Sequence, residues 1–125
     1  MEQNTPAKKI KPFVQNILQC GCPDEVFELI EYSPDTTMDK ILIGQKLLIY
    51  VIKTINIKNL DEVIQNLCIS GIQERNKNLY NRFRLVILSN PDSNIANHIK
   101  SIFASIPGRD EKVHLHLIAK NLYIQ

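Results

Sequence analysis

The sequence lacks any apolar run long enough to cross a membrane. Its longest such run is the six residues Leu47–Ile52, whereas a membrane-spanning helix needs roughly 20. Residues 1–6 also lack the apolar core of a secretion signal. We therefore expect a cytoplasmic protein with no membrane partner.

The sequence also has no large excess of positive or negative charge. The 125 residues hold 15 Lys and Arg against 13 Asp and Glu, a net charge of +2. This excess is too small to indicate a nucleic-acid or membrane-surface partner by itself. Cysteine is sparse as well, and an odd count of three argues against a secreted disulfide framework.

Several catalytic signatures are missing. No glycine-rich loop stands at a predicted strand-to-helix junction, so nucleotide binding by the usual route is not expected. The sequence shows no HExxH motif, no Ser-His-Asp order and no paired-carboxylate pattern. Hydrolytic catalysis therefore has no support, and whether the protein is an enzyme stays open.

What is present is the pattern of an α/β domain. Leu47–Ile52 is apolar on both alternating faces, which predicts a strand covered on both sides. Residues 26–32 allow a strand, with one helical turn at 24–27 as an alternative. The other predicted elements are helices at 11–19, from 59 into 73–81 and 93–105, and strands at 40–54, 82–89 and 113–119.

These elements predict one domain over residues 1–125, with 1–6 as a loose tail. Their order is α-β-β-α-β-α-β, which we interpret as a hairpin followed by two βαβ units. The fold class is thus α/β, a four-stranded mixed sheet with helices packed on it. Gly44 interrupts the second strand, where glycine often marks a bulge or a close approach. Asn59 and Glu62 have the spacing of a helix-capping pair.

The most unusual chemistry lies in Cys20-Gly21-Cys22-Pro23, after the first predicted helix. Two thiols separated by one residue can bind a soft metal, such as zinc or the iron of an iron–sulfur centre. They can also exchange with a disulfide, because a helix start after Cys22 would lower a thiol pKa. The alternative is a pair of small buried apolar side chains at a helix end.

Phe13-Val14 followed by Cys20-Gly21-Cys22-Pro23-Asp24-Glu25-Val26-Phe27 resembles the N-terminal signature of small uncharacterised α/β proteins of anaerobic prokaryotes. The resemblance covers about the first third of the chain. It implies that Cys20, Cys22 and Pro23 are functional, and it implies no particular activity.

Three other residues are weaker metal ligands. Cys68 lies on the apolar stripe of the second predicted helix, where a core thiol is the simpler interpretation. His114 and His116 share one face of the last predicted strand and could chelate a metal, although a half-exposed polar strand face is the simpler interpretation.

A local basic cluster comprises Arg75, Lys77, Arg82 and Arg84, with Tyr80 and Phe83 interleaved. This pattern is typical of a small nucleic-acid surface, but the low net charge favours a solvated loop.

Two functions follow as hypotheses. The first is thiol redox chemistry or soft-metal binding through Cys20 and Cys22. The second is a non-enzymatic protein-interaction module that forms a homodimer through an uncovered sheet face or edge.

Overall fold

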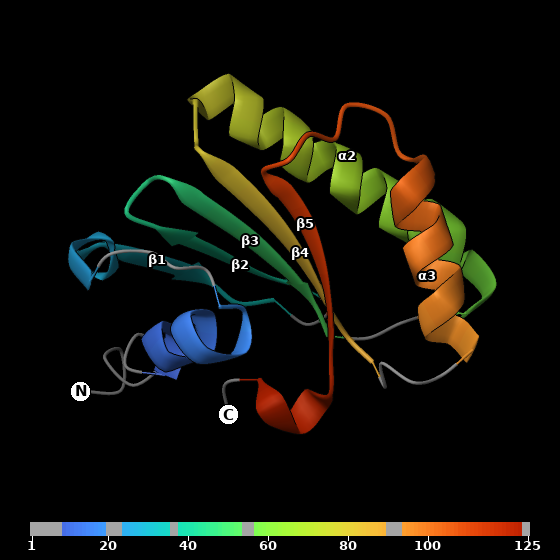
Figure 1. The fold of residues 1–125 in the computed structure, drawn as a ribbon, viewed down its shortest axis with the longest axis horizontal. Coiled ribbons are helices and arrows are strands. Elements are labelled where there is room, and N and C mark those ends of the chain that lie inside the picture. Colours follow the sequence, from blue (N-terminus) through green and yellow to red (C-terminus); the bar gives the residue numbers. More distant parts are fainter. Residues whose placement is uncertain (1–8, 20–23, 36–37, 54–56, 90–93, 124–125) are drawn as a thin grey trace.

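A central mixed sheet organises the protein in the computed structural model, which describes residues 9–19, 24–35, 38–53, 57–89 and 94–123 (Figure 1). Residues 9–12 are helical and lead directly into η1. The elements are η1 Phe13–Ile17, η2 Asp24–Glu28, β1 Ile30–Ser33, β2 Met38–Ile43, β3 Leu47–Ile52, η3 Ile57–Asn59, α2 Leu60–Asn78, β4 Arg82–Leu88, α3 Asn94–Ser105, β5 Val113–Ile118 and η4 Lys120–Leu122. The α/β class with a mixed sheet and packed helices is therefore confirmed.

The sheet has five strands in the order β1-β2-β3-β4-β5, so the prediction of four was wrong. The single strand expected over 40–54 is two antiparallel strands, β2 and β3, joined by a turn at Gly44–Lys46. Gly44 and Gln45 take left-handed φ angles of 58° and 54°, the backbone of tight hairpin turns. A Cβ at Gly44 would also lie 2.9 Å from the Val26 carbonyl oxygen, so this glycine makes the close approach that its position suggested.

The remaining pairings follow from the connections. Strands β1 and β2 are antiparallel, as a short link requires, while β3 pairs with β4 and β4 with β5 in parallel. Helices α2 and α3 make the two crossovers. The predicted order α-β-β-α-β-α-β is therefore not confirmed, because three strands precede α2 and the first helical elements are the short η1 and η2.

Alternating side chains of β3 pack into two hydrophobic cores, one on each face of the sheet. Leu47, Ile49 and Val51 pack with residues of the first helical segment, and we call this side the N-terminal face. Leu48, Tyr50 and Ile52 pack with residues of α2 and α3 on the other side, the α2–α3 face. All six β3 residues are buried, which confirms the prediction of a strand covered on both sides. Figure 1 shows the first helical segment and η4 opposite α2 and α3.

Helix ends differ in detail from the expectation. The first helical segment is followed by Gln19, which has a φ of 53°, while Gly21, the expected left-handed residue, lies outside the described residues, as does the predicted tail at 1–6. Asn59 directly precedes α2, but its side chain makes no capping hydrogen bond. The predicted cap is therefore wrong, and α2 begins on the 3-10 turn η3 instead.

Candidate functional site

The carbonyl of Leu18 fixes the end of the first helical segment against the sheet. Leu18 is buried on the N-terminal face, and its oxygen accepts a hydrogen bond from Arg84 Nη1 at 3.3 Å. Cys20 and Cys22, which follow, lie outside the described residues, so their predicted role is untested. The described contact nevertheless ties the segment that leads to them to strand β4.

Arg84 connects this helix end to His116. Arg84 is 7 % exposed, and its Nη1 lies 2.7 Å from His116 Nε2. Because a guanidinium only donates hydrogen bonds, Nε2 must accept and the imidazole proton resides on Nδ1. Burial, with a further contribution from the Arg84 charge, lowers the pKa of His116 to about 4. His116 is therefore neutral at pH 7.

His114 lies two residues earlier on the same face of β5, opposite Arg84 in the register of β4 and β5. Its side chain is exposed. Partial desolvation lowers the pKa of His114, and the charges of Arg84 and Arg82 add to this effect. A neutral imidazole is the form that binds metals, so the environment keeps His114 in a ligand-competent state.

Cys68 lies on the other side of the sheet. Its side chain is fully buried in the α2–α3 core, where burial raises the thiol pKa to about 11. A metal ligand must be a thiolate, and Leu18 and the two histidines occupy the opposite face. This placement argues against Cys68 as a third ligand and favours its interpretation as a core residue.

The basic cluster is divided by the fold. Arg75 forms a bidentate pair with Asp110, at 3.1 and 2.9 Å. Phe83 and Arg84 are both buried, on opposite faces of β4. A continuous nucleic-acid surface would need these side chains on one exposed face, so the cluster does not form the platform that its sequence resembled.

A buried carboxylate at the start of β2 was not among the predicted site residues. Asp39 is 1 % exposed. Its Oδ2 accepts hydrogen bonds from the hydroxyls of Tyr123 at 2.7 Å and Tyr32 at 3.3 Å. Its Oδ1 accepts the Asp35 N–H at 3.1 Å and lies 2.9 Å from Lys53 Nζ. Asp39 pairs with Val51 near the C-terminal end of β3, and ligands of parallel sheets commonly bind beyond such strand ends.

The environment of Asp39 nevertheless indicates a structural anchor. Burial alone would raise its pKa, but hydrogen bonds from Tyr123, Lys53 and the Asp35 backbone outweigh that effect and hold the pKa below its usual range. Burial and the neighbouring carboxylate raise the pKa of Tyr123, so this phenol is not an activated acid or base. With four protein donors on two oxygens, the carboxylate is already saturated.

Among the described residues, no three or more His, Cys, Asp and Glu side chains gather in a way that could hold a metal ion. The described helices include none with the length and apolar character needed to span a membrane. Comparison with protein-family models, curated proteins and solved structures finds no match to this chain.

Proposed function

We propose that the protein binds a soft metal ion, zinc or the iron of an iron–sulfur centre, through Cys20 and Cys22. The observation that carries the proposal is the Arg84–Leu18 hydrogen bond beside His116. Residue 20 follows Leu18 by two peptide units, a reach of about 7 Å at most. The described part of the first helical segment ends on the side of the sheet that holds the two histidines, which supports the proposal. The resemblance of this segment to small proteins of anaerobic prokaryotes implies the same importance for the cysteines and stays a prediction.

His114 is the additional ligand that we propose for this ion. His116 already directs Nε2 at Arg84, which leaves His114 as the exposed imidazole on that face. Two thiolates and an imidazole form a common partial coordination set for zinc.

Thiol–disulfide exchange is the alternative chemistry of the same pair. Both uses need thiols that stay reduced until they react, which supports a cytoplasmic location as part of the proposal. Metal content and thiol reactivity distinguish the two.

The test is elemental analysis and thiol titration of protein purified without oxygen. We expect about one zinc per chain, or iron with sulfide, in the wild type. Cys20→Ser and Cys22→Ser should each abolish the bound metal, and His114→Ala should weaken it. Cys68→Ser is the matched control and should retain full metal content. Metal-free protein whose Cys20 and Cys22 form a reversible disulfide would favour thiol–disulfide exchange. Metal-free protein in which both thiols are inert would contradict metal binding and exchange alike.

A second candidate function is that of a non-enzymatic protein-interaction module that forms a homodimer. The observation that favours it is Leu79, whose side chain is 88 % exposed. An exposed large apolar residue is typical of contact surfaces when it is grouped with others. Light scattering tests this candidate, since a monomer at all concentrations would remove the homodimer.

A further inference from the structure

Two exposed leucines lie at the end of the sheet where the parallel strands β3, β4 and β5 begin. Leu29 is 47 % exposed and Leu79 is 88 % exposed. The turn between β2 and β3 connects them, because Gly44 N–H donates to the Leu29 carbonyl and Asn81 N–H donates to the Lys46 carbonyl, both at 2.8 Å. Figure 1 shows η2, this turn and the C-terminal end of α2 along one side of the molecule. We call this surface the turn edge.

Leu79 occupies a position that normally belongs to glycine. It follows α2 with φ 61° and ψ 33°, in the left-handed region. Tyr80 N–H donates to the Arg75 carbonyl and Leu79 N–H to that of Asn76, which is the Schellman pattern of helix ends. A left-handed conformation disfavours a residue with a Cβ. A leucine that is both disfavoured by its backbone and exposed contributes little to the isolated fold, so a contact outside it is the better explanation.

Charge is separated along the turn edge. Glu25, Glu28 and Glu31 are exposed around η2 and β1, and we call them the acidic half; Lys11 lines a pocket with the first two. Lys46 and Lys77 are exposed and form the basic half, while the cleft at Leu79 is lined by residues of both signs. The whole chain has a net charge of only +2. The separation on this surface is therefore local.

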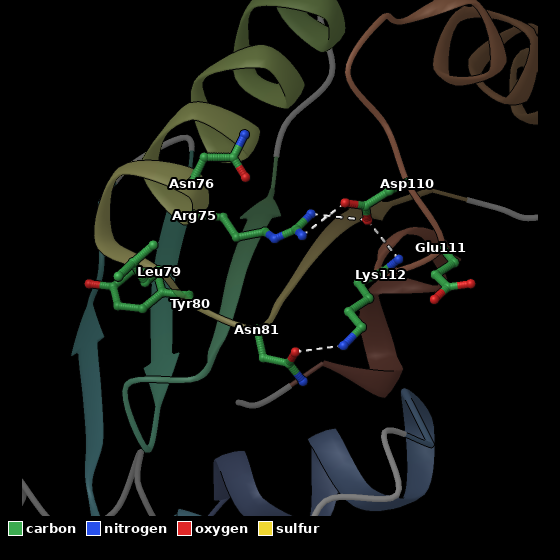
Figure 2. Close-up of a pocket in the computed structure, with 8 residues that line it drawn as sticks. All are labelled: Arg75, Asn76, Leu79, Tyr80, Asn81, Asp110, Glu111 and Lys112. Carbon is green, nitrogen blue, oxygen red and sulfur yellow. Dashed lines mark hydrogen bonds and ion pairs between the residues drawn. The ribbon is translucent and has the colours of Figure 1, made fainter.

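A cleft of about 630 Å³ adjoins Leu79 and Tyr80. Figure 2 shows its walls fastened by the Arg75–Asp110 pair and by Lys112, which donates to Asn81 at 2.9 Å. The cleft is therefore formed without a ligand, and Leu79 and Tyr80 give one side of it apolar character. An apolar side chain such as Leu29 is of a size that this cleft can accept.

We propose that the turn edge is a two-fold interface with a second copy of this chain. The acidic half of one copy contacts the basic half of the other, and Leu29 of one copy packs against Leu79 and Tyr80 at the cleft of the other. A two-fold interface requires one patch that complements itself, which the adjacent acidic and basic halves supply. A nucleic acid or an acidic peptide would complement the basic half alone. This inference rests on the second candidate function and is independent of the thiol site.

Sedimentation velocity of the full chain over a concentration series tests the interface. We expect a dimer whose dissociation constant rises with salt, because exposed charge pairs are screened. Leu79→Ser should weaken it about tenfold or more, as expected for a central apolar contact. Leu122→Ser is the matched control, since Leu122 is 48 % exposed but lies on η4, and it should leave the dimer unchanged.

Charge reversal identifies the pairing of the halves. Glu28→Lys with Glu31→Lys makes both halves basic, and Lys46→Glu with Lys77→Glu makes both halves acidic. Each variant should be monomeric alone, and an equimolar mixture should form a heterodimer. Circular dichroism melting confirms that each variant is folded.

Three results would overturn the inference. One is a wild-type monomer at all concentrations, including a monomer that binds polyglutamate or a single-stranded oligonucleotide through Lys46 and Lys77. The second is a dimer that neither charge reversal weakens, which would leave the interaction module standing on another surface. The third is a mixture of the two reversed variants that stays monomeric.

Discussion

Leu79 gives an expectation for stability at the scale of one residue. Glycine adopts the left-handed conformation without the steric penalty that a Cβ introduces. Because Leu79 is 88 % exposed, removing its side chain loses few packing contacts within one chain. Leu79→Gly should therefore raise the free energy of unfolding by about 1 kcal/mol, measured by urea denaturation at a protein concentration where the chain is monomeric.

Leu29→Gly is the matched control for this prediction. Leu29 is also an exposed leucine, but it is not among the residues with positive φ. Its replacement should lower stability, so a gain in both variants, or in neither, would contradict the backbone argument.

Gly71 shows the opposite behaviour inside α2. A Cβ there would lie 2.1 Å from Cζ of Phe83, which is fully buried and packs edge-on against Tyr50 at 5.1 Å between ring centroids. The ring has no free space to enter. Gly71→Ala should therefore lower the free energy of unfolding by roughly 1–3 kcal/mol, although alanine is the better helix former.

The control for Gly71→Ala is Ser70→Ala on the exposed side of the same turn. It should be neutral or slightly stabilising in the same denaturation experiment. If Gly71→Ala matched it, the contact between α2 and Phe83 would be looser than described. In the sequence, Gly71 only weakens the prediction of a helix. The position of β4 shows why glycine is needed there, because the Phe83 ring occupies the space of a Cβ.

At the scale of elements, Asp39 fastens three segments that are distant in sequence. Its carboxylate receives Tyr123 from the turn η4, Tyr32 from β1 and Lys53 from the end of β3. Tyr123→Phe removes the 2.7 Å donor and leaves the buried carboxylate one partner short. We expect a loss of about 1.5–3 kcal/mol in the free energy of unfolding, the usual range for a hydrogen bond to a charged group.

Two further tyrosine variants calibrate this loss. Tyr32→Phe should have a smaller effect, since its hydrogen bond is longer at 3.3 Å. Tyr80→Phe, outside this network, should be close to neutral. Equal losses from all three variants would show that Asp39 does not hold η4 on the sheet.

Strand β3 and the parallel units could be predicted because their signals are local. Leu47–Ile52 is apolar on both faces, and each crossover helix has its own apolar stripe. The division between β2 and β3 was missed because apolar residues continue to both sides of the turn, and Gly44-Gln45-Lys46 lacks the Asn-Gly or Asp-Gly pair that marks a hairpin.

The candidate site was predictable only in part, for the same reason. The alternation of His114 and His116 placed them on one face without any knowledge of the fold. Arg84 contacts Leu18 across 66 residues of sequence, and Asp39 contacts Tyr123 across 84. No local pattern reports such pairs, although a single arginine inside the apolar run 83–88 is a signal that it will be buried and will need acceptors.

For the whole molecule, ionisable groups with shifted pKa values lie on both sides of the sheet. The N-terminal face holds Arg84, His116 and Asp39 beside its apolar core. On the other side, Glu74 of α2 accepts a hydrogen bond from Tyr50 and pairs with Lys40. The stability of the whole fold is therefore linked to pH through both faces.

Acid should destabilise the fold in two stages, and the first depends on His116. Its folded pKa is about 4, whereas an unfolded histidine takes up a proton near 6.5. As pH falls from about 6.5 to 4, the unfolded chain binds the proton first and the free energy of unfolding decreases. Below this window the lowered pKa values of Asp39, Glu74 and Asp110 add a further decrease, because their stabilisation is lost as each carboxylate is protonated.

Urea denaturation at a series of pH values separates the two stages. In His116→Gln, whose amide oxygen can still accept from Arg84, we expect a clearly shallower decrease between pH 6.5 and 4, with the remainder arising in part from His114, whose pKa is also lowered. The decrease below pH 4 should be unaffected. A wild-type slope in His116→Gln would mean that Arg84 and burial do not hold His116 neutral in the folded protein.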